Sequence, residues 1–159
     1  MQEIKLAFIG NPNCGKTTLF NAYTGQRLKV ANYPGVTIEK KEGELEYKNK
    51  QIVITDLPGI YSLNSYSIEE KVSKEFIENE DLDVIIDVVD ASSLERNLYL
   101  TLQLIENNKN IIIALNMMDI VKKRGMNIDI KKLEETLGVK VIPISAKTKE
   151  GLKELLEAI

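Results

Sequence analysis

The chain has 159 residues, of which 43% are hydrophobic and 28% are charged, a composition typical of one globular domain and not of a disordered chain. Its 21 basic and 24 acidic residues give a formal charge of −3, so we expect no broad basic surface for nucleic acid. A single cysteine, Cys14, excludes an internal disulfide, and the absence of histidine excludes an imidazole base.

The sequence predicts neither a signal peptide nor a membrane helix. The stretch Met1 to Lys5 is mostly polar, and apolar runs such as Ile111–Leu115 are far shorter than the roughly 20 residues that span a bilayer. We therefore expect a soluble fragment in a reducing environment.

Short β-branched runs alternate with amphipathic segments along the whole chain. Five runs are apolar on both faces, which is typical of parallel strands covered by helices on both sides. They lie at Ile4–Ile9, Gln51–Thr55, Val84–Val89, Asn110–Leu115 and Val139–Ile144. Another run, Glu39–Tyr47, alternates in polarity, which favours a solvated edge strand joined to the second run by a turn at Asn49-Lys50.

Between the strands, apolar residues recur every three or four positions, which predicts amphipathic helices in segments 68–76, 94–105, 130–137 and 152–159. Gly138 is placed to cap the third of these helices. The order of elements predicts a single α/β domain, residues 1–159, with three layers and a six-stranded, mostly parallel sheet that has one antiparallel edge strand. Right-handed crossovers would then bring the strand-to-helix loops to one rim, where ligands bind.

Residues 10–17 match the phosphate-binding pattern G-x-x-x-x-G-K-[ST] between a predicted strand and a predicted helix. Gly10 and Gly15 permit a backbone whose N–H groups point at phosphate oxygens, and the helix that begins at Lys16 adds its positive end. We expect Lys16 to bridge the β- and γ-phosphates and the Thr17 hydroxyl to bind Mg²⁺. The alternative is a chance glycine turn, which the flanking elements disfavour.

Two residues inside this loop have further interpretations. Pro12 lies beside the expected γ-phosphate, and its ring would crowd an arginine inserted by a partner, which argues against an arginine finger. Cys14 lies near Lys16 and a helix N-terminus, an environment that lowers the pKa of a thiol. It is either a reactive thiol or, as we favour, a small residue that fits the loop.

Two more motifs follow predicted strands. In Asp56-Leu-Pro-Gly59, the carboxylate of Asp56 can hold Mg²⁺ through water, and the N–H of Gly59 can reach the γ-phosphate. In Asn116-Met-Met-Asp119, the carboxylate of Asp119 can accept hydrogen bonds from guanine N1–H and the exocyclic amine, which adenine does not offer in that arrangement.

The remaining base contacts are expected from Met117 and from Ser145-Ala146-Lys147. Met117 replaces the lysine of the usual N-K-x-D pattern, so apolar packing over the base and a weaker guanine affinity are expected. The N–H of Ala146 would meet guanine O6 while Lys147 covers the ring. The full set of predicted nucleotide-site residues is Gly10, Asn11, Pro12, Asn13, Cys14, Gly15, Lys16, Thr17, Thr18, Gly35, Val36, Thr37, Asp56, Gly59, Asn116, Met117, Asp119, Ser145, Ala146 and Lys147.

These motifs resemble those of the Ras-like P-loop GTPase superfamily over the whole chain. Residues 10–21, 30–43, 56–63 and 116–119 resemble more specifically the N-terminal G domain of the ferrous iron transport protein B (FeoB) family. This resemblance implies the Ras-like fold and a place on the cytoplasmic face of a membrane iron transporter. The fragment's partners would be a guanine nucleotide and the helical and transmembrane parts of its own full-length protein, with a homo-oligomer left open.

The resemblance also assigns the moving parts. Asn32–Thr37 would be switch I, with Gly35 as a hinge and Thr37 closing onto Mg²⁺ and the γ-phosphate; the alternative is that Thr37 is an ordinary residue at the start of a strand. Residues 59–67 would be switch II. Ile60 stands where many small GTPases carry a glutamine that orients water, so slow hydrolysis is expected.

In the potassium-activated subgroup that FeoB members resemble, an asparagine at the place of Asn13 binds K⁺ beside the phosphates. The alternative is that Asn13 only stiffens the loop. The expected catalytic residues are Asn13, Lys16, Thr37 and Gly59, with Mg²⁺ held by Thr17, Thr37 and Asp56. Two other functions stay open: a GTP/GDP sensor that does not hydrolyse, and a GTPase of the ribosome-assembly or RNA-modification type.

Overall fold

The computed structural model describes residues 1–107 and 110–159. Its strands, in chain order, are β1 (Gln2–Gly10), β2 (Leu28–Asn32), β3 (Glu39–Tyr47), β4 (Lys50–Asp56), β5 (Val84–Asp90), β6 (Ile111–Asn116) and β7 (Lys140–Pro143). They form one seven-stranded sheet in the order β2-β3-β4-β1-β5-β6-β7. Strands β4, β1, β5, β6 and β7 run parallel, whereas β3 is antiparallel to β4 and to β2. The predicted α/β architecture is confirmed.

The sheet has one strand more than the six that the sequence predicts, and the prediction that Glu39–Tyr47 is the edge strand is wrong, because β3 lies between β2 and β4. Strand β2 pairs with β3 from Leu28 opposite Gly43 to Asn32 opposite Glu39. All five of its residues are exposed, Leu28 and Val30 among them, so the strand is held at a sheet edge by backbone hydrogen bonds and not by apolar packing. The turn between β3 and β4 also lies one residue earlier than expected: Lys48 and Asn49 have φ of 45° and 65°, as a tight hairpin turn requires.

The helices are α1 (Lys16–Thr24), α2 (Ile68–Asn79), the 3₁₀ turn η1 (Ala91–Ser93), α3 (Leu94–Asn107), α4 (Met118–Lys123), α5 (Ile130–Leu137) and α6 (Leu152–Ala158). The sequence patterns predict the longer ones, and Gly138 caps α5 with φ 71°, as expected. Helix α4 and η1 are too short for a periodic pattern to show. Helix α2 begins with a capping box between Ser67 and Glu70.

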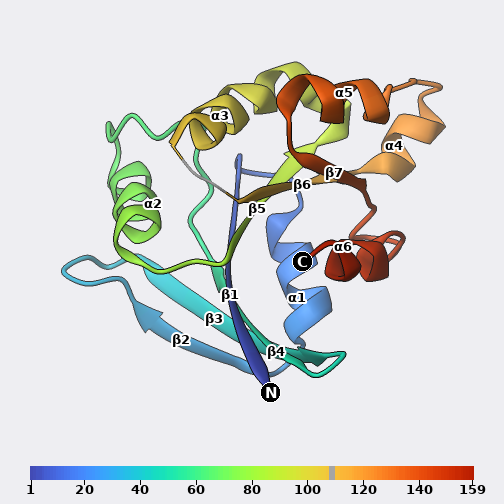
Figure 1. The fold of residues 1–159 in the computed structure, drawn as a ribbon. Coiled ribbons are helices and arrows are strands. Elements are labelled where there is room, and N and C mark those ends of the chain that lie inside the picture. Colours follow the sequence, from blue (N-terminus) through green and yellow to red (C-terminus); the bar gives the residue numbers. More distant parts are fainter. Residues whose placement is uncertain (108–109) are drawn as a thin grey trace.

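The helices cover both faces of the sheet, with α1 and α6 on one side and α2 and α3 on the other (Figure 1). Leu19, Phe20 and Leu155 pack on the first face against the even-numbered positions of β1 and β5. Leu100 and Leu104 of α3 pack on the second face. Because both faces of β1, β5 and β6 are covered, these strands are apolar on both sides, and their carboxyl ends reach the same rim.

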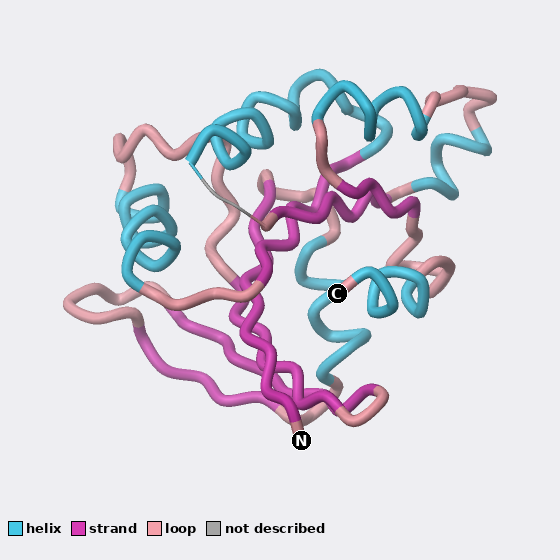
Figure 2. The backbone as a smooth tube through the Cα atoms, in the orientation of Figure 1, coloured by secondary structure: helices cyan, strands magenta, loops and turns pink. Residues whose placement is uncertain are grey.

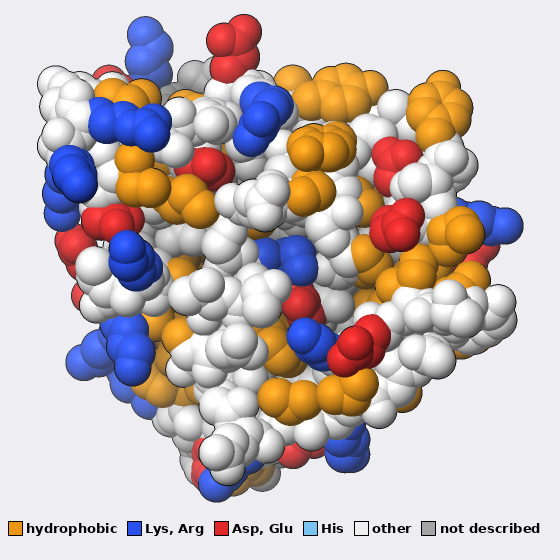
Figure 3. Space-filling model, turned by 180° about the vertical axis from the view of Figure 1, so that it is seen from behind, with side chains coloured by type: hydrophobic (Ala, Val, Ile, Leu, Met, Phe, Trp, Pro, Cys, Tyr) orange, Lys and Arg blue, Asp and Glu red, His pale blue; other side chains and the backbone are white. Residues whose placement is uncertain are grey.

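The surface carries charges of both signs. Figure 3, a view from behind, shows lysine and arginine side chains interspersed with acidic and apolar ones on that face. Among the described residues, no helix combines the length and the apolar character needed to cross a membrane.

Candidate functional site

A cavity of about 520 Å³ opens at the carboxyl end of β1. Its wall is mainly the loop between β1 and α1, with one residue from each of two other strand-end loops. The lining residues are Asn11, Pro12, Asn13, Cys14, Gly15, Lys16, Thr17, Thr18, Gly59 and Met117. The fold therefore brings the predicted phosphate loop, one residue of the Asp-x-x-Gly motif and one residue of the Asn-x-x-Asp motif around one space.

The phosphate loop reverses direction through unusual backbone angles. Asn13 and Gly15 have φ of 65° and 88°, and the N–H of Cys14 donates to the carbonyl oxygen of Asn11 at 3.3 Å. Helix α1 then begins at Lys16, and in the part of the chain that the structure describes no side chain caps its first turn. Its free N–H groups, together with those of the loop, form the kind of concave donor surface that binds phosphate.

Lys16 bridges this loop to the end of β4. Its Nζ lies 2.5 Å from Oδ1 of Asp56, and both side chains are only 9% exposed. The Lys16 ammonium and the Asp56 carboxylate therefore neutralise each other here. When a nucleotide and Mg²⁺ bind, this ion pair would have to open, so that Lys16 contacts phosphate and Asp56 contacts the metal ion. The exposed hydroxyl of Thr17 and the carboxylate of Asp56 fit the few protein oxygens that Mg²⁺ takes beside phosphate and water.

Asn116 joins the phosphate loop to the base-recognition loops. Its Nδ2 donates to the carbonyl oxygen of Cys14 at 2.9 Å, and its Oδ1 accepts from the N–H of Ala146 at 2.9 Å. Asn116 is 3% exposed, so both bonds are shielded from water. This one carboxamide fixes the spacing between the loop expected to hold phosphates and the loop expected to hold guanine.

The carboxylate of Asp119 is oriented by a neighbouring loop, since the hydroxyl of Ser145 donates to its Oδ1 at 3.0 Å. Met117 has φ 67°, and its side chain lies over Gly15. Lys147 is exposed. The N–H of Ala146, expected to meet guanine O6, already donates to Asn116 in this arrangement.

The expectation of a lowered thiol pKa at Cys14 is wrong. The side chain is 1% exposed, and burial raises the pKa of its thiol to about 11, although Lys16 acts in the opposite direction. Desolvation of the thiolate outweighs the nearby positive charge. Cys14 is thus a small buried residue that faces the core, which favours the second of its two interpretations.

The tip of the predicted switch I, Gly35 to Thr37, does not line the phosphate-loop cavity. Gly35, Val36 and Thr37 form the tip of the β2–β3 hairpin, closed by the N–H of Tyr33 on the carbonyl oxygen of Ile38 at 2.9 Å. Figure 2 shows this hairpin loop far to the side of the end of β1. Thr37 is exposed and does not line the cavity in this structure.

Tyr33 anchors this hairpin, which the sequence did not indicate. The residue is 4% exposed, its hydroxyl donates to the carbonyl oxygen of Asp56 at 3.2 Å, and its ring packs edge-on against Phe76 of α2. The only available signal was an aromatic residue in a loop of small and polar residues.

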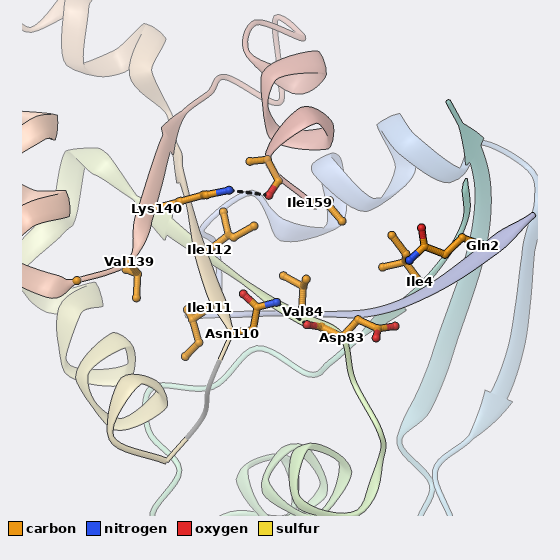
Figure 4. Close-up of a pocket in the computed structure, with 12 residues that line it drawn as sticks. Gln2, Ile4, Asp83, Val84, Asn110, Ile111, Ile112, Val139, Lys140 and Ile159 are labelled. Carbon is orange, nitrogen blue, oxygen red and sulfur yellow. Dashed lines mark hydrogen bonds between the residues drawn. The ribbon is translucent and has the colours of Figure 1, made fainter. Parts of the chain in front are cut away.

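A second cavity, of about 500 Å³, lies at the opposite rim, where the parallel strands begin (Figure 4). Asp83, Asn110 and Lys140 bring polar groups to it, but Asn110 and Lys140 are bonded to the carbonyl oxygens of Asp83 and Ala158. None of the predicted site residues lines this cavity. Ligands of open α/β sheets bind beyond the carboxyl ends of the strands, so the phosphate-loop cavity is the candidate site.

A phosphate loop tied to an Asn-x-x-Asp loop, at the carboxyl rim of a mostly parallel sheet, places the chain among the P-loop GTPase-type domains. Within that class, the model of the family described as ferrous iron transport protein B matches residues 4–159, and the chain belongs to this family.

Similar proteins support this family assignment. The Fe(2+) transporter FeoB of Helicobacter pylori strain J99 is 50% identical over 150 residues, which is 94% of this chain and 23% of the transporter. The Fe(2+) transporter FeoB of Campylobacter jejuni is 47% identical over 159 residues, all of this chain and 26% of the transporter. The chain thus spans about a quarter of the length of these relatives.

Solved structures share the fold closely. The FeoB G-domain of Methanococcus jannaschii superposes with a TM-score of 0.89 at 49% identity, covering 99% of this chain and 96% of that one. The cytosolic domain of T. maritima FeoB in a GDP form superposes with a TM-score of 0.96 at 47% identity, covering 98% of this chain and 61% of that one. The same domain in its GMPPNP form gives 0.95.

Proposed function

We propose that the chain binds GTP and GDP with Mg²⁺ in the phosphate-loop cavity and hydrolyses GTP slowly, as a nucleotide-operated switch. The observation that supports this proposal most is the Asn116 bridge: the side-chain amide of Asn116 is hydrogen-bonded at 2.9 Å both to Cys14 of the phosphate loop and to Ala146 of the base loop. The GDP and GMPPNP forms of T. maritima FeoB support the choice of nucleotide.

Guanine selection tests the site directly. We expect Asp119→Ala to weaken GTP binding by about 100-fold, because the guanine N1–H and amine would lose a charged acceptor. ATP binding, weak in the parent, should change by less than threefold. Competition titrations with GTP, GDP and ATP measure both effects. Lys123→Ala, at an exposed position of helix α4 outside the predicted nucleotide-site residues, serves as the control, and equal losses for ATP and GTP would contradict a role in base selection.

GTP hydrolysis is expected to require a group outside switch II that assists the reaction at the γ-phosphate. Ile60 is 2% exposed, and its backbone N–H donates to the carbonyl oxygen of Gly10 at 3.0 Å, so its side chain offers water no hydrogen bond. Asn13 is exposed in the cavity wall, where a carboxamide oxygen can bind a monovalent cation beside the phosphates.

We therefore expect GTP turnover to be at least about tenfold faster in K⁺ than in Na⁺, and this advantage to disappear in Asn13→Ala. Turnover at saturating GTP and constant ionic strength measures it. Asn13 has φ of 65°, where alanine is strained by about 1 kcal/mol, so Asn13→Ala should bind GDP no more than about fivefold more weakly than the parent. Equal rates in the two salts would leave Asn13 with a role in loop stiffness only.

We further propose that this nucleotide switch is the cytoplasmic-face part of a ferrous iron transporter and that its nucleotide state controls Fe²⁺ uptake through the remaining parts of the full-length protein. The support is the family assignment and the length of the named transporters, about four times that of this chain. The absence of a glutamine at Ile60 also favours a second candidate, a GTP/GDP sensor without hydrolysis, which the turnover measurement distinguishes.

A further inference from the structure

A directional chain of hydrogen bonds joins switch II to helix α3. The N–H of Leu63 donates to Oε1 of Gln103 at 2.8 Å, and Nε2 of Gln103 donates to Oδ1 of Asn64 at 2.8 Å. Nδ2 of Asn64 then donates to the hydroxyl oxygen of Tyr99 at 3.4 Å. Gln103 and Tyr99 lie one turn apart on α3, about 40 residues from the segment they hold.

The backbone sets the direction of this chain. Because the N–H of Leu63 can only donate, it requires the carbonyl oxygen of the Gln103 side chain to face it, and the Gln103 amide nitrogen must then face Asn64. Asn64 in turn presents its own nitrogen to Tyr99. Gln103 is the member that contacts both the backbone and a side chain of switch II, so its carboxamide works as a clamp.

Apolar packing holds this segment at Ile60 and partly at Leu63, and contributes little beyond them. Tyr61, Ser65 and Tyr66 are exposed, and Leu63 is half-buried. Beneath Leu63, a groove of about 560 Å³ lies between α2 and α3, with Gln103 on its wall. Ser65 has φ of 65°, an uncommon conformation for a residue other than glycine. Ser62 is buried and its hydroxyl donates to Glu70 of α2, so the segment is held on one side by α2 and on the other by the hydrogen bonds to α3.

The amino end of the same segment belongs to the reaction site. Gly59 lines the phosphate-loop cavity and lies against Pro12, and the N–H of Ile60 donates to Gly10. Three residues therefore separate the peptide that is expected to contact the γ-phosphate from the peptide that Gln103 holds. Displacing Leu63 would weaken the constraint on Gly59 from its carboxyl side and leave Ile60 and Ser62 as the remaining fixed points of the segment.

We propose that Gln103 is a positioning residue for GTP hydrolysis, acting through switch II without contacting the nucleotide. The inference rests on the proposed GTPase function of the site. Loss of the clamp lowers the rate of the chemical step, because a loosened Gly59 N–H meets the γ-phosphate less often in a reactive geometry. Binding of GDP is unaffected, because, among the described residues, none of the hydrogen bonds made by Gln103 involves the phosphate loop or the base loops.

Two substitutions separate the clamp from general stability. Gln103→Met keeps the length of the side chain and removes both hydrogen bonds, whereas Gln103→Glu keeps an acceptor for the Leu63 N–H. Single-turnover hydrolysis at saturating GTP should be roughly tenfold slower in Gln103→Met and within threefold of the parent in Gln103→Glu. GDP affinity should stay within twofold in both. Glu106→Gln, an exposed position on the same groove, should leave every value unchanged.

Amide hydrogen exchange gives a readout that needs no hydrolysis. We expect the Leu63 amide to exchange at least about tenfold faster in Gln103→Met and to keep its protection in Gln103→Glu. If the parent protein hydrolyses no GTP, the proposed function fails, and the exchange experiment still tests the clamp. Parent-like hydrolysis or parent-like Leu63 exchange in Gln103→Met would overturn the inference. So would a loss of GDP affinity that matches the loss of rate.

Discussion

Gly15→Ala is expected to weaken GTP and GDP binding by at least about 100-fold, the largest effect on binding that we predict. A Cβ at this position would lie 2.2 Å from Nδ2 of Asn116, and Gly15 has φ of 88°. Asn116 has no freedom to withdraw, because its two amide atoms are bonded to Cys14 and Ala146. Moving it would separate the phosphate loop from the base loop and leave buried polar groups without partners. Calorimetric titration with GDP measures the loss.

The matched control for this prediction is Gly138→Ala. Gly138 has φ of 71°, but a Cβ there would meet no atom of residues 1–107 or 110–159 within 4 Å. It therefore suffers the same kind of backbone strain, about 1 kcal/mol, without the collision. We expect parent-like GDP binding and a slightly lower melting temperature for Gly138→Ala. If both variants bound GDP equally well, the Asn116 bridge would not be what sets the geometry of the site.

The parts of the fold that sequence reasoning found are those in which burial imposes a pattern. Strands β1, β5 and β6 are covered on both faces and are therefore continuous apolar runs, and the motifs at their carboxyl ends follow from that placement. The helix end at Gly138 could also be predicted, because it depends on a single glycine next to the helix. Strand β2 has no buried face: the alternation of Leu28, Lys29 and Val30 is too short to predict a strand, and only the pairing with β3 defines it.

The sequence does not indicate the contacts that link distant segments of the chain. Gln103 reads as one polar residue on a helix, and nothing local relates it to Leu63, 40 positions away. The same holds for Tyr33 and Asp56. The prediction of a lowered pKa for the Cys14 thiol is wrong for another reason. Its neighbours in sequence indicate a positive environment, but the pKa depends mainly on burial by the folded chain, which no local motif encodes.

Asp87 interrupts the apolar run of β5, and the structure gives this interruption a physical consequence. The residue is 1% exposed, and burial raises the pKa of its carboxyl from 3.8 to about 7, while a hydrogen bond from the Thr101 hydroxyl at 2.5 Å acts in the opposite direction. In the unfolded chain the carboxyl ionises near 3.8. Between these two values the folded state holds a proton that the unfolded state releases.

Asp87→Asn is therefore expected to raise the free energy of unfolding at pH 8, by on the order of 4 kcal/mol, and to have little effect at pH 4. Below pH 3.8 the carboxyl is neutral in both states and the parent suffers no penalty. As the pH rises toward 7, the unfolded state ionises first, so the parent loses stability relative to the asparagine variant, whose carboxamide is neutral throughout. Urea unfolding of both proteins from pH 4 to pH 8 measures the difference.

The difference between the two proteins isolates Asp87, because every other titrating group is common to both. Asp81→Asn is the control: it removes an exposed carboxylate, so its stability difference from the parent should vary far less with pH. A gap between Asp87→Asn and the parent that stays constant from pH 4 to pH 8 would contradict the raised pKa. A gap that opens as the pH rises would identify β5, the strand beside the phosphate-loop strand, as carrying a carboxyl that opposes folding at neutral pH.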